Sequence, residues 1–136
     1  MRKDLDLHVT LNGDLPGHRY LVVNDGDHVH SFDKHPDPHS IRWTLSGNAS
    51  DGEFCALEGA APGFQWGTQA PREGIFRQLS RPSARTLSMH NHHVDRTSEG
   101  HWPYQLRARF GDQIYQTMWT SANGADTSSN PTIKNT

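Results

Sequence analysis

Residues 102–119, which read WPYQLRARFGDQIYQTMW, decide the fold of this chain. Apolar residues stand at every second position of the first half: Trp102, Tyr104, Leu106, Ala108 and Phe110. Successive side chains on a strand point to opposite faces, so this alternation predicts a strand with one dry and one wet face. Gly111-Asp112 follows and suits a two-residue turn, because both residues accept positive φ. The stretch therefore predicts a β-hairpin.

The turn also fixes the expected register of the hairpin. The predicted cross-strand neighbours are Phe110 with Gln113, Ala108 with Tyr115, Leu106 with Thr117, and Tyr104 with Trp119. One face of such a hairpin is aromatic, and a lone hairpin cannot cover it. A second sheet is needed.

The composition of the whole chain agrees with this architecture. The 136 residues are 32% hydrophobic, with a mean hydropathy of -0.83, and they include 12 glycines and 8 prolines. Low apolar content favours antiparallel sheets with one solvated face, and frequent glycine and proline favour many short strands joined by turns. The length fits one domain.

Charge and hydropathy exclude several classes of partner. The formal net charge is -2, from 13 basic and 15 acidic residues without a block of either sign, so no nucleic-acid partner is expected. No run approaches the roughly 20 apolar residues that cross a bilayer, and residues 1–10 lack the apolar core of an export signal. The single cysteine, Cys55, excludes an intrachain disulfide. We expect a cytoplasmic protein that contacts no membrane.

Further strands are predicted throughout the chain, and the period of an ordinary helix appears nowhere over ten or more residues. Proline-containing segments at 35–38 and 81–83 are expected to interrupt the sheets. With the hairpin, about 7–9 strands should form a sandwich, or failing that a small barrel. We expect one domain over residues 1–120 and a polar tail over 121–136, in which Ile133 could dock a last short strand. The other strand candidates are 5–11, 18–24, 28–32, 41–45, 53–58, 74–79 and 84–92.

Ten histidines offer the first candidate for chemistry. His28 and His30 form one H-x-H pair, and His90 and His92 form another. On a strand, such a pair presents two imidazoles on the same face, so two adjacent strands could bind a divalent transition metal. Four more histidines in or near loops could complete the set: His35, His39, His93 and His101. The alternative is that these histidines are solvent-facing polar positions without a cofactor.

Motifs of known enzymes are incomplete in this chain. His28-Val29-His30 opens like the first motif of cupins, but the glutamate needed four or five residues after the second histidine is absent. His93-Val94-Asp95 has the H-x-D spacing of non-haem iron oxygenases, without a third ligand downstream. There is no G-x-S-x-G elbow. Cys55 suits a buried, inert position better than a nucleophile. We therefore lean towards a non-enzymatic protein and name no catalytic residue.

Two surface features suggest binding. Trp66 lies with Phe64 in a long Gly/Ala/Pro-rich connection, where the pair could bind carbohydrate or could plug the open end of a sandwich. The other tryptophans are assigned to the core.

Arginines beside apolar residues are common at protein interfaces and also on ordinary solvent-exposed sheets. Such residues occupy the outer face of the hairpin: Arg107, Arg109, Ile114, Gln116 and Met118.

Three stretches resemble a known family. The strand IRWTLSG, the segment EGHWPYQLRARFGDQIYQT and the closing NPTIKN are similar to small bacterial proteins of uncharacterised function, of the DP-EP type. The resemblance covers about half of the chain. It implies an immunoglobulin-like β-sandwich and no catalytic residues.

Together these observations predict an all-β, immunoglobulin-like sandwich of two antiparallel sheets. The preferred hypothesis is a non-enzymatic binding or assembly module whose partner is another protein or a second copy. The alternatives are a metal-binding protein that uses His28, His30, His90 and His92, and a carbohydrate-binding module that uses Trp66 and Phe64. The predicted core is Leu7, Val9, Ile41, Trp43, Leu45, Phe54, Leu87, Tyr104, Leu106 and Tyr115.

Overall fold

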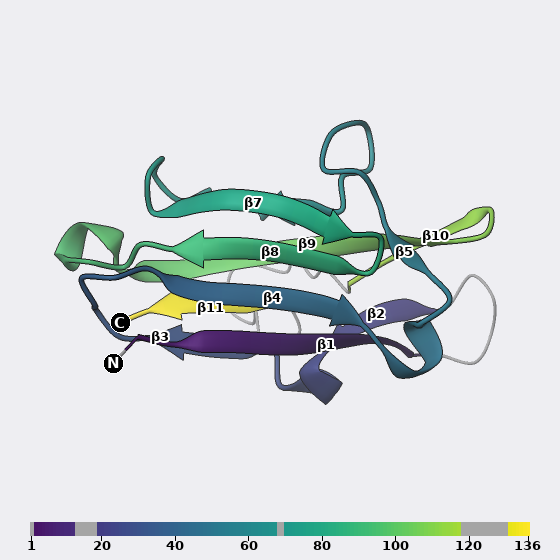
Figure 1. Ribbon diagram of the computed structural model, residues 1–136, viewed down its shortest axis with the longest axis horizontal. Coiled ribbons are helices and arrows are strands. Elements are labelled where there is room, and N and C mark those ends of the chain that lie inside the picture. Colours follow the sequence, from purple (N-terminus) through teal and green to yellow (C-terminus); the bar gives the residue numbers. More distant parts are fainter. Residues whose placement is uncertain (1, 13–18, 68–69, 118–130) are drawn as a thin grey trace, which may run out of the picture.

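The computed structural model describes residues 2–12, 19–67, 70–117 and 131–136. Within these residues the chain forms 11 strands, in two sheets that face one another as a sandwich (Figure 1). The helical elements are three 3-10 turns of three residues each, at Asn24–Gly26 (η1), Gly47–Ala49 (η2) and Arg96–Ser98 (η3). The predicted all-β sandwich is confirmed, with more strands than the 7–9 expected. None of these helical turns has the length or apolar character needed to span a bilayer.

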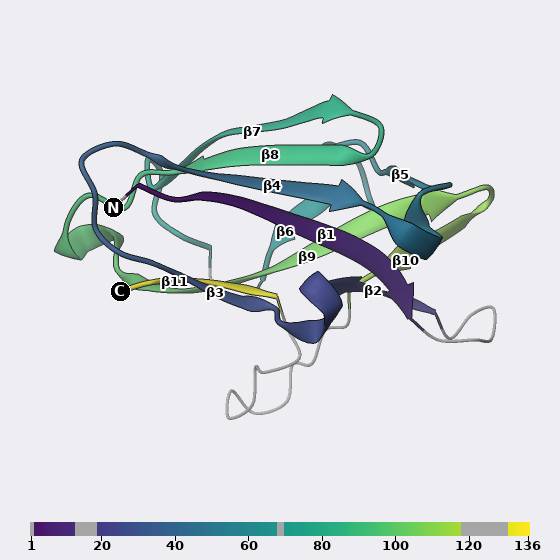
Figure 2. The same ribbon diagram turned by 60° about the horizontal axis from the view of Figure 1, so that its bottom comes forward.

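The first sheet has five strands in the order β2-β1-β4-β8-β7. β1 runs parallel to β4, and the other neighbours are antiparallel. Figure 2 shows this sheet above the second one. Its strands are β1 (Asp4–Asn12), β2 (Tyr20–Val23), β4 (His39–Leu45), β7 (Phe76–Ser83) and β8 (Thr86–Asn91).

The second sheet follows the order β10-β9-β11-β3, and two short strands, β5 and β6, also pair with β9. β11 lies between β9 and β3, antiparallel to the first and parallel to the second. The sheets are mainly antiparallel, as expected, but each also contains one parallel pair. The strands are β3 (Val29–Phe32), β5 (Glu53–Phe54), β6 (Phe64–Trp66), β9 (Gly100–Phe110), β10 (Gln113–Gln116) and β11 (Thr132–Asn135).

The predicted hairpin is present as β9 and β10. Gly111 has a φ of 64° in the turn, and Gln113 pairs with Phe110 while Tyr115 pairs with Ala108. The register continues beyond β10, where the backbone N–H of Thr117 donates to the carbonyl of Leu106 at 3.0 Å. Those three expected pairs are confirmed; Trp119 and Met118 lie outside the described residues.

The core lies between the sheets and contains all ten predicted residues. Its centre is aromatic: the ring of Phe64 stacks on Tyr104, with centroids 5.3 Å apart, and the indole of Trp43 meets both rings. The Trp43 Nε1–H donates to the hydroxyl of Tyr104 at 3.0 Å. A hydrogen bond between the two sheets thus satisfies the two polar groups of this centre.

The C-terminal strand departs from the expected polar tail. β11 occupies an inner position of the second sheet, and the side chain of Ile133 is 2% exposed. A short strand around Ile133 is therefore confirmed, but it belongs to the sandwich rather than to a tail beyond residue 120. Residues 121–130 lie outside the described residues.

Three further expectations about strands were wrong. The strand expected over 53–58 ends at Phe54, where the chain turns so that Gly63 passes against the carbonyl of Cys55. The expected connection over 59–72 contains β6. β7 continues through Arg81-Pro82-Ser83, because it is an edge strand with irregular pairing, where proline is tolerated.

Candidate functional site

The two H-x-H pairs do not converge. His90 and His92 lie half-buried at the end of β8 in the first sheet, with ring centroids 6.5 Å apart. His28 and His30 belong to the start of β3 in the second sheet, and His30 points inward while Val29 is exposed. Among the residues that the structure places, no three His, Cys, Asp or Glu side chains are grouped to hold a metal ion. The metal hypothesis has no geometric support there.

Three histidines are instead buried, which contradicts the expectation of solvent-facing positions. His30, His39 and His93 are 8%, 1% and 0% exposed. His39 begins β4, where its Nδ1 accepts from the backbone N–H of Lys3 at 2.9 Å. Its Nε2 lies 2.7 Å from the carbonyl of Asp33. Because Nδ1 is an acceptor, Nε2 carries the proton and the ring is neutral.

His93 belongs to a buried polar network at the same end of the sandwich. Its Nδ1 lies 2.7 Å from the hydroxyl of Ser98, and its Nε2 lies 3.1 Å from the carbonyl of Thr136. Beside it, Asn91 and Asn135 exchange amide hydrogen bonds of 2.8 and 3.2 Å, and Asn135 also donates to the carbonyl of Ser98. The network joins the ends of β8 and β11 to η3, so its role is structural.

His30 is the exception among these buried groups. Neither of its ring nitrogens has a hydrogen-bond partner among the described residues. Burial lowers the pKa of His30, and burial also lowers that of His39. Both side chains are therefore held in the uncharged form in the folded state.

We expect the protein to lose stability in mild acid. In the unfolded chain these two histidines titrate near the ordinary pKa of about 6.5. Stability is thus full above that pH and falls below it, where only the unfolded state takes up protons. The slope should reach about 1.4 kcal/mol per pH unit for each histidine. Urea unfolding between pH 8 and pH 5 measures it.

The matched variants are His39→Gln and His101→Gln. Replacing the buried His39 should reduce the pH slope, although it also lowers stability at every pH, whereas replacing the exposed His101 should leave the slope unchanged. A free energy of unfolding that stays constant from pH 8 to pH 5 would contradict this account of the buried histidines.

The potential nucleophiles are also inert. Cys55 is buried, as predicted, and burial raises the pKa of its thiol. Burial likewise raises the pKa of the Tyr104 hydroxyl well above its usual range. Nucleophilic catalysis needs the ionised form, so neither side chain is poised for it.

The aromatic pair proposed for carbohydrate binding is not displayed in a loop. Phe64 is 5% exposed in the core, and Trp66 packs its ring against Phe76, with centroids 4.7 Å apart. Both residues lie on β6, which pairs with β9. Phe64 therefore lies in the sandwich interior, and Trp66 is half-buried against it.

Of the two hairpin arginines, Arg107 is occupied within the sheet. Its guanidinium donates to the carbonyl of Pro62 and to the side chains of Gln65, Gln105 and Gln116, over 2.8–3.2 Å. This ties β6 and β10 to β9. Arg109 is exposed and pairs across the hairpin with Ile114, which is 43% exposed.

No protein-family model, curated protein or solved structure matches this chain. Its function must therefore be argued from its own geometry.

Proposed function

We propose that the protein is a non-enzymatic assembly module that associates with a second copy of itself through the open edge of β10. One part of the support is chemical: the buried histidines, Cys55 and Tyr104 are committed to packing or to hydrogen bonds within the fold. The remaining support comes from the edges of the two sheets.

The observation that carries the proposal is the contrast between two edge strands. β7 is an edge strand of the first sheet. It contains Pro82 and two arginines and pairs irregularly with β8, and each of these features disfavours pairing with another strand. β10 ends the second sheet with the sequence QIYQ, which contains no charge and no proline. β2 lies beside the end of β10, where Leu21 and Thr117 form a parallel bridge, so the unpaired part of this edge is around Ile114 among the described residues.

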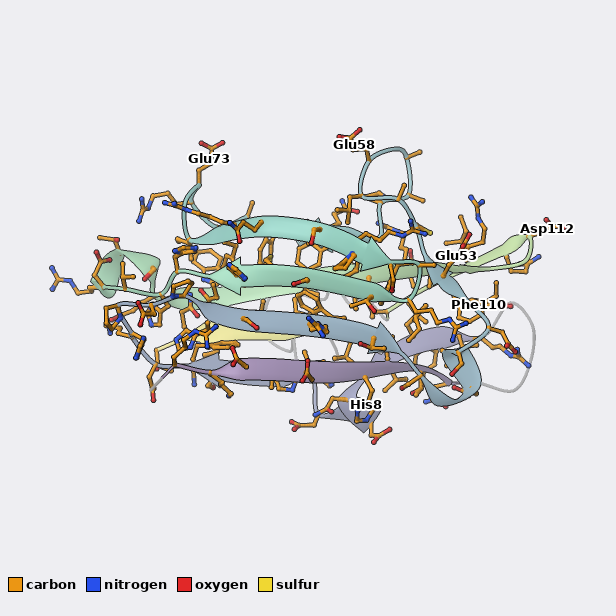
Figure 3. All side chains as sticks on the ribbon, viewed as in Figure 1. His8, Glu53, Glu58, Glu73, Phe110 and Asp112 are labelled. Atoms are coloured by element: carbon orange, nitrogen blue, oxygen red, sulfur yellow. The ribbon has the colours of Figure 1, made fainter. Side chains whose placement is uncertain are left out.

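The orientation of the β10 backbone follows from the hairpin register. The N–H of Thr117 points to β9, since it donates to Leu106, and backbone groups alternate in direction along a strand. The N–H groups of Ile114 and Gln116 therefore point away from β9. The hairpin also projects beyond the rest of the sandwich (Figure 1), and Asp112 lies at its tip (Figure 3). Among the described residues, the part of this edge around Ile114 is left for a second copy.

We expect the mass in solution to rise with concentration, from one chain towards two. Ile114→Pro should abolish this association, because it removes an outward N–H without removing a bond to β9. Ile114→Thr is the matched control, since it keeps that N–H and a β-forming side chain. Sedimentation equilibrium over a range of concentrations measures the effect. A wild-type mass of one chain at all concentrations would refute self-association.

Two finer assignments belong to the same proposal. An immunoglobulin-like classification is supported by the two-sheet sandwich and by the resemblance of three strands to the DP-EP type. A cytoplasmic location is supported by the single cysteine, because small secreted domains commonly carry disulfides. The proposal involves neither nucleic acid nor membrane, in keeping with the mixed charges of the chain.

A further inference from the structure

A hollow of about 290 Å³ opens beside the start of β7, between residues 72–77 and the turn around η3. Its polar lining comes from three separate segments. Arg72 and Arg77 lie on one side, His92 follows β8, and Thr97 belongs to η3. Two arginines therefore border this concave site, whose lining also includes Glu73 and Asp95.

Both arginines are exposed, and each makes one side-chain hydrogen bond that leaves other donors available. One Nη of Arg72 donates to the hydroxyl of Thr97 at 2.9 Å, and Nε of Arg77 donates to the carbonyl of Gly74 at 3.1 Å. Among the described residues, neither Nη of Arg77 has a protein acceptor. A guanidinium fixed through one nitrogen in this way presents its remaining N–H groups as a fork for an oxyanion.

Two carboxylates, Glu73 and Asp95, line the hollow together with the arginines, and the charge of Arg72 acts on Asp95. Asp95 accepts from both the backbone N–H and the hydroxyl of Thr97, and these bonds lower the pKa of its carboxyl. Glu73 points its carboxylate away from the sandwich (Figure 3). No ion pair of Arg72 or Arg77 is found in the described part of the chain. The charge of Arg77 also reaches His92, whose pKa is lowered first by burial and then by this arginine.

We propose that this hollow binds a tetrahedral oxyanion, such as the phosphate group of a small ligand. Arg72, Arg77 and His92 all line the hollow, so donors from three side chains border the space in which an anion would bind. A tetrahedral oxyanion offers these donors more acceptor oxygens than a single carboxylate does. The site is independent of the association proposed for β10.

Isothermal titration calorimetry with inorganic phosphate at low ionic strength tests the site, since added salt would screen it. We expect one phosphate per chain, and about tenfold weaker binding or more for Arg77→Gln, which removes the free fork. Arg42→Gln is the matched control, because Arg42 is exposed on β4 and the variant changes the net charge equally. Its affinity should remain that of the wild type, and acetate should bind more weakly than phosphate.

Three results would overturn the site: no heat of phosphate binding to the wild type, an equal loss in the two variants, or acetate binding as tightly as phosphate. Equal losses would show a response to net charge alone. None of these results tests self-association. Arg77→Gln does not change β10, and association is measured separately, by the mass of the protein in solution. A monomeric protein that binds phosphate would in turn retain the site and refute the assembly proposal.

Discussion

Deletion of residues 131–136 is expected to abolish the cooperative fold, although these residues make up a small part of the chain. β11 bonds to β9 on one side and to β3 on the other, so its loss separates the second sheet. The deletion also removes the buried side chain of Ile133 from the core, and it leaves the side-chain amide of Asn91 without its partner, Asn135. Burial of one such side chain contributes about 1.5–3 kcal/mol, and each orphaned buried polar group costs about 1–3 kcal/mol.

These losses together approach the whole stability of a small domain, which is about 5–15 kcal/mol. Near-ultraviolet circular dichroism and a thermal melt would measure the result, and we expect neither a native signal nor a cooperative transition. Lys134→Ala is the control, because this half-exposed side chain alternates with the buried Ile133 and Asn135 and makes no hydrogen bond among the described residues. A truncated chain that melts cooperatively near the wild-type temperature would show that β11 is dispensable.

Trp43→Ala is expected to lower the free energy of unfolding by about 3–5 kcal/mol. The side chain is completely buried on β4 and contacts the rings of Phe64 and Tyr104. Its removal leaves a cavity at the centre of the core, and the Tyr104 hydroxyl loses its donor. Urea denaturation followed by circular dichroism gives the value, since the variant also loses tryptophan fluorescence.

Tyr104→Phe separates the hydrogen bond from the packing. It keeps the ring but leaves Nε1 of Trp43 without an acceptor, which should cost about 1–3 kcal/mol. We therefore expect Tyr104→Phe to be less destabilising than Trp43→Ala. A loss below about 1 kcal/mol for Trp43→Ala would mean that this aromatic centre is not the core of the sandwich.

The hairpin, the ten core residues and the sandwich could be predicted from the sequence. The alternation of apolar and polar residues shows which side of each strand is buried. The same alternation also indicates which polar residues are buried. His39 is in phase with Ile41 and Trp43, and Asn91 is in phase with Leu87 and Met89. Polar residues at such positions are buried when partners exist, and those partners come from other strands, such as Asn135 for Asn91.

The open edges and the hollow could not be predicted, because they depend on strand order. Arg72 and His92 are 20 positions apart, and only the pairing of β7 with β8 brings their segments together. Likewise, β5 and β6 pair with the side of β9 opposite to β10, and β2 reaches the end of β10 at the Leu21–Thr117 bridge. Periodicity reports which residues are buried, but it does not report which strands are neighbours.

We propose that the buried histidines, His30, His39 and His93, serve the fold rather than a metal site. Elemental analysis of the purified protein, with zinc, copper and nickel titrations followed by the melting temperature, tests it most directly. We expect no stoichiometric metal and no rise in melting temperature. A bound ion at 100 times its dissociation constant would add about 2.7 kcal/mol. One tightly bound metal per chain, lost in the His30→Ala, His92→Ala double variant, would contradict the claim.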